Sequence, residues 1–403
     1  MQNTQYKTLL IIVIGCLIIA SCGKKSRQMA RSDVNGTLPV IELQADYPHK
    51  DVDLHDLADV TYTPLETTDE SLIGVVGNFF FCNDTILMED IKQHKVLMFN
   101  TEGKYLSSFR RIGNGNTDYT GIGSMCVDVD AHEIFILDFY RMNRIIVYDF
   151  TGNFVRELTI DQDLGGIRIF NCDQDNLLLF CKKDMYKTSF GEKVSGYPYY
   201  LISKQTGKAT PVPLWVENRK NNSFSVRVGK DSIYSTAIGF GSQLINSPRG
   251  IVISDYALDT VYRYANHTLE PLFVRHADND HRGLLSGLLL TNDDFSLIGI
   301  AEAYIQNNKI DTSETRLLLY DHHSGQVNEI NLTNSDIPAH VKVTPYSVDN
   351  SQYPSDVLTA INYSADYLLE QYREGGLSGK LKEIAAGLSE EDNPVLVIAK
   401  RKK

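Results

Sequence analysis

The stretch that decides the fold is KVLMFNTEGKYLSSF at Lys95–Phe109, in which two apolar runs flank a polar turn at Gly103. The pattern returns as RIIVYDFTGNFVREL at Arg144–Leu158, with Gly152 at the turn. Glycine supplies the positive φ of a tight turn, and β-branched and aromatic residues flank it, so each stretch predicts a β-hairpin. Three less regular copies follow: YYLISKQTGKATPVPL at Tyr199–Leu214, VYRYANHTLEPLF at Val261–Phe273 and RLLLYDHHSGQVNEINL at Arg316–Leu332.

The hairpins belong to a longer repeat, because two more short apolar runs precede each of them. The turn positions recur at spacings of about 49, 55, 60 and 58 residues; they are Gly103, Gly152, Gly207, Asn266-His267 and Gly325. Four short strands in a unit of this length are typical of propeller blades. We therefore expect an all-β chain folded as a six-bladed β-propeller, with five units between about residues 78 and 332.

The two chain ends are expected to build the sixth blade, since a shared blade closes the ring without an exposed sheet edge. In this scheme the terminal VLVIA stretch within Pro394–Lys400 pairs with an N-terminal strand. The other strand-like pieces outside the five units are Leu38–Leu43, Val60–Leu65 and Val341–Val348.

A short helical insertion is predicted at about 364–391, before the closing strand. Ser364 can cap a first helix that ends at Gly375-Gly376. The second helix carries an apolar face that we expect to pack against the rim of the propeller rather than against a partner; its residues are Leu381, Ile384, Ala385 and Leu388.

The first segment, residues 1–22, reads as a bacterial lipoprotein signal peptide. Lys7 precedes an apolar run of about a dozen residues, which is too short to span a bilayer as a helix. The ending Ile19-Ala20-Ser21-Cys22 resembles a lipobox, which predicts that Cys22 is lipidated and becomes the mature N-terminus. The alternative is a signal peptide with a coincidental cysteine. Residues 23–37 would form a flexible tether, and 38–403 the propeller.

Composition narrows the partners and the location. The net charge of −12 becomes −13 when Lys7 leaves with the leader, so bulk electrostatics give no support to a polyanion-binding surface, and we expect no nucleic-acid partner. The tether is basic and suits an anionic membrane surface. With a lipid on Cys22 we expect anchoring to the outer membrane of the cell envelope. An acidic run after the cysteine would resemble the surface-export signal of related envelopes. None follows Cys22, so we expect the protein on the periplasmic side of this membrane rather than on its surface.

The cysteines that remain after the leader also follow the repeat. Cys82, Cys126 and Cys172 fall at nearly the same place in three successive units, in the first strand, while Cys181 lies outside this series. First strands crowd round the axis, where free cysteine serves as a small apolar side chain. The alternative, a disulfide or metal site between adjacent inner strands, has no histidine at the repeated position to support it.

The chain resembles the Bacteroides-type six-bladed β-propeller lipoproteins. The resemblance rests on VTYTPLETTDESL at Val60–Leu72, the loop RRIGNGNTDYTGIG at Arg110–Gly123, the VYD-x-x-G-x-F hairpins and the ending EEDNPVLVIAKRKK. It covers nearly all of the mature chain and implies the fold and the compartment, but no settled activity. In related sequences the loop after the first blade is richer in Gly, Pro and Glu. Here that place is taken by Asn114, Asn116, Thr117 and Asp118.

The clearest candidate for ligand binding is an insertion at about Lys183–Pro198. Aromatic side chains on such a loop can stack against sugar rings or a partner surface, because they combine a large area with a polar tip. The alternative is that strand tyrosines pack between blades. The candidates are Tyr186, Tyr197, Tyr199, Tyr200 and Trp215.

Two further kinds of site have weaker signals. A metal could be held by His276, Asp278, Asp280 and His281, although this run lacks the spacing of a calcium loop and reads more simply as an exposed turn. Short Asp-Thr/Ser-Ile/Val sequences resemble the O-glycosylation signal of this bacterial group, although such residues also favour turns; the acceptors would be Thr85, Ser232 and Thr260.

Two functions follow from these signals. The first is a binding module without catalysis, which presents loops at one face of the ring to a glycan, a peptide or an envelope protein and needs no cofactor. The second is a lyase or hydrolase with a metal-assisted site at the central channel, which would require calcium or zinc. The fold does not choose between them. The inner-strand positions that align hold Cys or apolar residues rather than His and carboxylates, which favours binding.

Overall fold

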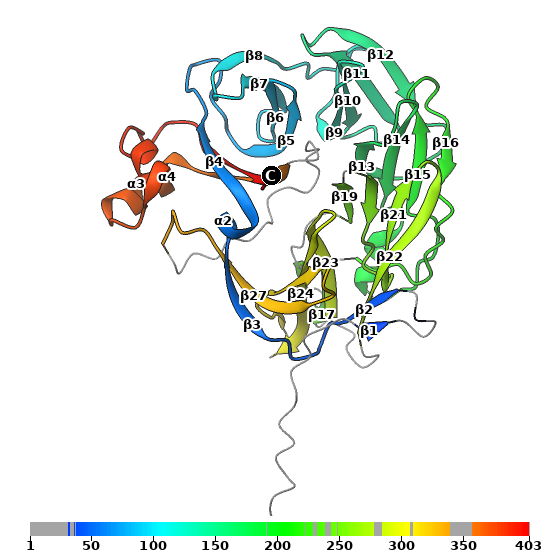
Figure 1. The fold of residues 1–403 in the computed structure, drawn as a ribbon. Helices are drawn as coiled ribbons and strands as arrows, with labels where there is room; N and C mark the ends of the chain where they lie inside the picture. The colour runs from blue at the N-terminus through cyan, green and yellow to red at the C-terminus, as the bar shows by residue number, and fades with distance from the viewer. Residues whose placement is uncertain are drawn as a thin grey trace, which may run out of the picture.

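The fold is taken from a computed structural model whose sheets stand side by side in a ring around a central axis (Figure 1). The ring is a six-bladed β-propeller, which confirms the fold that the repeats predict. The residues that the structure describes are 31–32, 36, 38–190, 192–221, 223–228, 232–237, 243–247, 249–277, 284–306, 309–338 and 357–402.

Blades 1 to 3 are four-stranded antiparallel meanders whose strands follow one another in chain order. The first strands of neighbouring blades contact each other, which places them at the inside of the ring. The strands are β5 (Val76–Cys82), β6 (Thr85–Asp90), β7 (Lys95–Asn100) and β8 (Tyr105–Phe109) in blade 1; β9 (Ile122–Asp128), β10 (Glu133–Asp138), β11 (Arg144–Asp149) and β12 (Phe154–Thr159) in blade 2; β13 (Gly166–Asn171), β14 (Asn176–Cys181), β15 (Tyr199–Ser203) and β16 (Ala209–Pro211) in blade 3.

The turns between the third and fourth strands have the predicted backbone. The six residues predicted at the turn positions all have positive φ: Gly103 84°, Gly152 78°, Gly207 72°, Asn266 50°, His267 59° and Gly325 71°. A second reason for glycine is contact with the preceding blade. A Cβ atom on Gly103 would lie 2.1 Å from the carbonyl oxygen of Pro64, and one on Gly207 would lie 2.3 Å from that of Thr159.

Blades 4 and 5 are widened by strands from the N-terminal part of the chain. β2 (Pro39–Glu42) pairs in parallel with the outer strand of blade 4, and β3 (His49–Asp53) with that of blade 5. We call residues 38–53 the N-terminal belt; β1 (Arg31–Ser32) pairs with β2 outside it. The blade strands are β19 (Leu244–Ser247), β20 (Gly250–Ile253), β21 (Thr260–Ala265) and β22 (Thr268–His276) in blade 4; β23 (Leu284–Thr291), β24 (Phe295–Gln306), β26 (Arg316–Asp321) and β27 (Val327–Thr333) in blade 5.

Blade 6 joins the two ends of the chain as predicted. β29 (Val395–Arg401) lies between β28 (Val357–Tyr363) and the N-terminal strand β4 (Ala58–Pro64), and both pairings are antiparallel. The predicted strand at 341–348 lies outside the described residues. The strand predicted at 38–43 is present as β2 but belongs to blade 4, because its apolar residues pack between blades 4 and 5.

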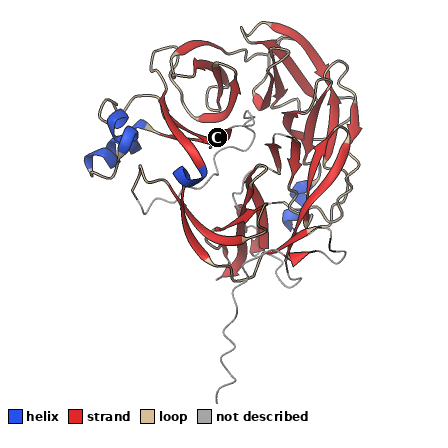
Figure 2. Ribbon diagram, viewed as in Figure 1, coloured by secondary structure: helices blue, strands red, loops and turns tan. Residues whose placement is uncertain are grey.

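The helical insertion is also present. α3 (Ala365–Arg373) and α4 (Gly379–Ala385) stand as a pair at the outside of the ring (Figure 2). Leu368, Leu381 and Ala385 are buried in one cluster with strand residues of blades 5 and 6, so the predicted packing against the rim is confirmed. Elsewhere in the described residues the short helices are α2 (Leu54–Leu57), between β3 and β4, and the 3₁₀ helix η1 (Met185–Phe190).

In the part of the chain that the structure describes, two hairpin elements lie outside the repeating pattern. β17 (Ser223–Val228) and β18 (Ser232–Ala237) form a hairpin between blades 3 and 4. β25 (Lys309–Thr312) pairs with the extended end of β24, and it contacts both β17 and β18.

The core of the ring consists of apolar layers between successive blades. Cys82 packs with blade 2, Cys126 with blade 3, and half-buried Cys172 with blades 3 and 4. Each repeated cysteine therefore faces the next blade as a small apolar group. These three and Cys181 are free thiols, and burial raises the pKa of Cys82 and of Cys172 to about 12.

Candidate binding face

One face of the ring is formed by loops rather than by tight turns. Because neighbouring strands are antiparallel, the loops between strands 2 and 3 leave at the same end as the links between blades, and the remaining turns leave at the other end. We call these the connection face and the turn face. Over blades 1 to 3 the connection face consists of residues 65–75, 91–94, 110–121, 139–143, 160–165, 182–198 and 212–221.

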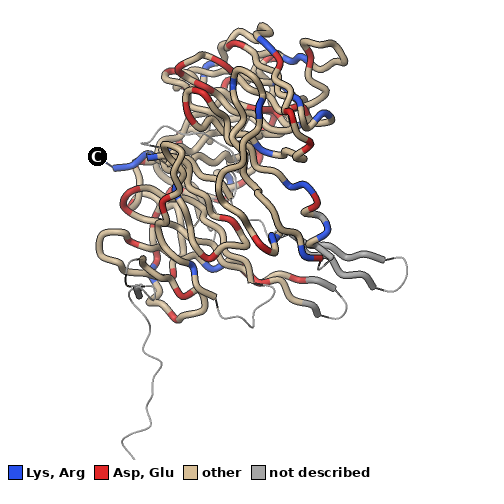
Figure 3. The backbone as a smooth tube through the Cα atoms, turned by 90° about the vertical axis from the view of Figure 1, so that its right-hand side faces the viewer, with Lys and Arg blue, Asp and Glu red and all other residues tan. Residues whose placement is uncertain are grey.

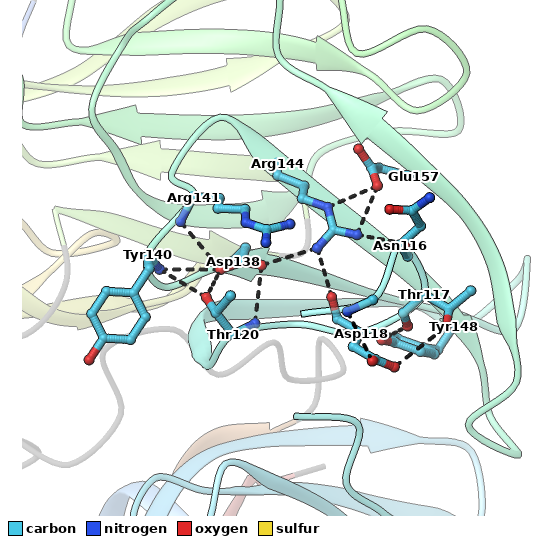
Figure 4. Close-up of polar contacts among 11 residues, drawn as sticks. Asn116, Thr117, Asp118, Thr120, Asp138, Tyr140, Arg141, Arg144, Tyr148 and Glu157 are labelled. Carbon is cyan, nitrogen blue, oxygen red and sulfur yellow. Dashed lines mark hydrogen bonds and ion pairs between the residues drawn. The ribbon is translucent and has the colours of Figure 1, made fainter. Parts of the chain in front are cut away.

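Asp138, the last residue of β10, is hydrogen-bonded to two loops of the connection face (Figure 4). Its carboxylate accepts hydrogen bonds from the backbone N–H groups of Thr120 at 3.1 Å, Tyr140 at 3.2 Å and Arg141 at 3.3 Å. The Thr120 hydroxyl donates to the same carboxylate. Asp138 is fully buried, and it therefore holds the link from blade 1 and the loop of blade 2 in one fixed arrangement.

Arg144, the first residue of β11, completes this network from the next strand. Its guanidinium donates to Glu157 at 2.8 Å and to Asp138 at 3.3 Å. It also donates to the carbonyl oxygens of Asp118 at 2.7 Å and Asn116 at 2.6 Å. A buried charge is tolerated when it is paired and hydrogen-bonded in this way. The loop that departs from related sequences thus supplies backbone acceptors to a buried arginine.

Blade 1 repeats the arrangement with Asp90 at the end of β6. The Asp90 carboxylate accepts from the backbone N–H groups of Gly74 at 2.7 Å and Val75 at 3.2 Å, which belong to the link from blade 6. It also accepts from Lys92 at 2.9 Å and Gln93 at 3.1 Å in the blade's own loop. In blades 1 and 2 the backbone of the connection-face loops is therefore held by hydrogen bonds to a buried aspartate.

An exposed aromatic pair lies on these fixed loops. The rings of Phe139 and Tyr140 meet edge to face with centroids 4.9 Å apart, and the two residues are 46% and 77% exposed. The Tyr140 ring points away from the polar network beneath it (Figure 4). His94 of blade 1 lies beside Phe139, with ring centroids 6.4 Å apart. The pair therefore offers ring surface at the boundary between blades 1 and 2.

A second aromatic pair comes from the predicted ligand-binding residues. Tyr197 and Trp215 meet edge to face at 5.1 Å, and both are exposed on the connection face of blade 3. Tyr199 was predicted with them, but it is fully buried, and its hydroxyl donates to Asp255 at 2.8 Å. It is a core residue because strand alternation turns it between blades 3 and 4. Tyr200 is half-buried, and the side chain of Tyr186 lies outside the described part.

The predicted metal ligands fall mostly outside the described residues, which include His276 but not Asp278, Asp280 or His281. His276 ends β22, and its Nδ1 lies 2.8 Å from the Glu42 carboxylate of the belt. In the part of the chain that the structure places, no three His, Cys, Asp or Glu side chains converge as a metal site would require.

The predicted glycosylation residues occupy strand starts. Thr85 is the first residue of β6, Ser232 the first of β18 and Thr260 the first of β21. Thr85 and Thr260 are half-buried. Modification at these positions stays a prediction.

The residues that organise the connection face were not identified from sequence. Asp90 and Asp138 end the second strands of their blades, and Asp255 follows the end of β20 by two residues; this recurrence is visible in the repeats as LMED, FILD and VISD. Arg144 and Tyr140 gave no such signal, because their roles depend on which loop lies above which strand.

Comparison with known proteins agrees with the fold. The profile of the domain of unknown function DUF4934 matches residues 38–400. No curated protein matches the sequence. Among the described residues, no helix combines the length and the apolar character that crossing a membrane requires.

Solved structures give the same architecture at low sequence identity. A Bacteroides fragilis protein named as exported has a TM-score of 0.60 and 14% identity, over 88% of this chain and 98% of its own. A member of the DUF4221 family from Bacteroides vulgatus has a TM-score of 0.51 and 10% identity, over 86% and 97%. Virginiamycin B lyase from Staphylococcus aureus reaches only 0.30 with 10% identity, over 67% and 98%, and has no bearing on activity.

Proposed function

The chain belongs to the DUF4934 family, whose activity is unknown, and we propose that it is a binding module of the cell envelope that works without catalysis. The observation that carries this proposal is the exposure of two aromatic pairs, Phe139–Tyr140 and Tyr197–Trp215, on one face of the ring. Aromatic groups provide much of the binding energy at recognition surfaces, and the loop that carries Phe139 and Tyr140 is hydrogen-bonded to the buried Asp138, which limits the ordering that a ligand must impose on it.

Most of the large exposed apolar side chains of the described ring lie on the same face. Single exposed apolar residues are normal on a protein surface, but their concentration on one side indicates an interaction site. On the connection face of blades 1 to 3 they are Leu72, Val75, Ile91, Ile112, Phe139, Tyr140, Met142, Tyr197 and Trp215. The ligand would be a glycan, a peptide or an envelope protein large enough to contact this face.

A ligand screen with the mature chain, Cys22→Ser, tests this function. We expect Tyr140→Ala and Trp215→Ala each to weaken binding of any ligand found by about tenfold or more, which corresponds to about 1.4 kcal/mol. Phe154→Ala is the matched control, because Phe154 is a similarly exposed aromatic residue on the outer strand β12. Full affinity in both connection-face variants would contradict the proposal.

The lipid anchor is a separate part of the proposal. We infer that Cys22 carries the lipid and that the basic residues after it lie near the membrane, with the ring on the periplasmic side of the outer membrane. Cells grown with labelled palmitate should label the wild-type protein but not Cys22→Ala. Label in the variant would refute the assignment of Cys22.

A further inference from the structure

Three exposed basic residues lie on the loops that carry or adjoin the aromatic pair of blades 1 and 2. Arg110 donates through Nε to the carbonyl oxygen of Gln93 at 2.8 Å, which brings it next to His94 and so to Phe139. Lys92 belongs to the same loop, and Arg141 directly follows Tyr140. We call this set the cation–aromatic strip; its members are Lys92, His94, Arg110, Phe139, Tyr140 and Arg141.

The three loops that carry the strip contain more basic than acidic residues. The protein carries a net charge of −12, and the two signs are interspersed over the ring (Figure 3). The loops 91–94, 110–121 and 139–143, however, contain four basic residues and a single acidic one, Asp118. Lys92, Arg110 and Arg141 are exposed, and none of them forms an ion pair with a described carboxylate. Their charge is therefore available to a ligand.

The backbone N–H groups of these loops are much less available for hydrogen bonds to a ligand. Asp90 and Asp138 accept the N–H groups of Lys92, Gln93, Tyr140 and Arg141, as they do those of the incoming links. Peptide recognition commonly uses a free sheet edge, main-chain hydrogen bonds or an apolar groove. The strip offers ring faces and cationic side chains instead. Such groups match a ligand that has its own ring faces and anionic substituents.

From this arrangement we infer that the strip binds an acidic glycan, one with uronate or sulfate groups on its sugar rings; the inference rests on the proposed binding function. A sugar ring would stack on Tyr140 and Phe139. Arg141 and Arg110 would pair with the carboxylate or sulfate groups, because a guanidinium matches their geometry with two parallel donors. Lys92 would add charge at the blade 1 end.

Titration calorimetry on the mature chain, Cys22→Ser, can test this with polygalacturonate, chondroitin sulfate, neutral dextran and poly-glutamate as probes. We expect binding of one or both acidic glycans and none of dextran or poly-glutamate. Tyr140→Ala and Arg141→Gln should each weaken that binding about tenfold. Arg249→Gln, which removes an exposed cation of the turn face, is the matched control. Affinity should fall as NaCl is raised, and less steeply in Arg141→Gln, because added salt screens exposed charges.

The outcomes separate this inference from the function on which it rests. Equal binding of dextran, with no effect of Arg141→Gln, would overturn the acidic preference and leave a glycan-binding module. Tight binding of poly-glutamate that is lost in Arg141→Gln would overturn the assignment of the ligand as a glycan and would identify the ligand as an acidic peptide. Loss of polygalacturonate binding in Trp215→Ala but not in Tyr140→Ala would move the site to blade 3. No binding of any probe would overturn the inference, and a wider screen that is also negative would contradict the binding function.

Discussion

Single aspartates decide the shape of the connection face. Asp90, Asp138 and Asp255 occupy the same place in blades 1, 2 and 4, where each carboxylate accepts hydrogen bonds from the loop that follows. All three are buried. Their recurrence makes the loops part of the rigid blade, although their tips are exposed.

Removing Arg144 tests how much the network of blade 2 contributes to stability. Arg144→Ala leaves the buried carboxylate of Asp138 without its cation and two loop carbonyl groups without a donor. We expect the free energy of unfolding to fall by about 3–5 kcal/mol, as for other broken buried ion pairs. Urea denaturation measures the change. Lys380→Ala, at an exposed pair on α4, should stay within about 0.5 kcal/mol, and a similarly small loss in Arg144→Ala would contradict the prediction.

The pH dependence of stability can be predicted at another buried pair. Burial alone would raise the pKa of Asp128, but the hydrogen bond and charge of Lys204, 2.6 Å away, outweigh it and hold the pKa below its usual value. Because the pKa is lower in the folded state, the ionised carboxylate stabilises the fold at pH values above the unfolded-state pKa of about 3.9. This stabilisation is lost as the pH falls through the lower pKa of the folded state.

Asp128→Asn removes that titration. Urea midpoints measured between about pH 7 and pH 2.5 should fall less with acid in the variant than in the wild type. The variant should also be less stable at pH 7, since the buried ammonium of Lys204 then keeps the Asp173 carbonyl oxygen but loses its carboxylate partner. If the urea midpoints of the two proteins fall in parallel with pH, the Asp128–Lys204 pair does not contribute to the pH dependence of stability.

The belt is the element that the repeats did not predict. β3 reads HKDVD, which has one buried apolar residue, Val52, and no alternation. It forms a strand because the free edge of β27 pairs with it, so the edge rather than the propensity of the segment decides its structure. The predicted strand at 38–43 is apolar enough to be recognised, but its sequence does not say which blade it joins.

Detaching β2 tests whether the belt is held by its apolar contacts. Ile41 is fully buried between blades 4 and 5, so Ile41→Ala leaves a cavity that costs about 2–5 kcal/mol. We expect faster proteolysis and faster amide exchange confined to β2 and its neighbours, because the blades remain closed without it. Lys50→Ala, at an exposed position of β3, should behave as the wild type. Unchanged exchange in Ile41→Ala would show that hydrogen bonding alone holds β2.

At the scale of the whole molecule, blade 6 connects the ends of the ring. β29 pairs on one side with β28 and on the other with β4, which lies more than 300 residues earlier in the sequence. Closure therefore pairs segments from opposite ends of the chain and removes two open sheet edges at once.

A charge inside β29 should open the ring. Val397 is buried and lies opposite Ile361 of β28 and Tyr62 of β4, so Val397→Asp places an unpaired carboxylate in the closing blade. We expect loss of the cooperative thermal transition and a larger radius in solution scattering. Lys402→Ala, next to the same strand but exposed, is the control. A compact, cooperative Val397→Asp protein would show that the ring closes without this strand.

The sequence by itself determined the repeat, the hairpin turns, the number of blades and the closing strand, because local apolar patterning and positive-φ turns specify them within each unit. It also named Tyr197 and Trp215 among five aromatic candidates, but it showed neither that these two form a pair nor that Tyr199 points inward. Only the tertiary structure decided the belt pairings, the burial of Arg144 and the strip around Tyr140. These depend on which loops the ring brings together, and side chains from separate blades meet only after the ring has closed.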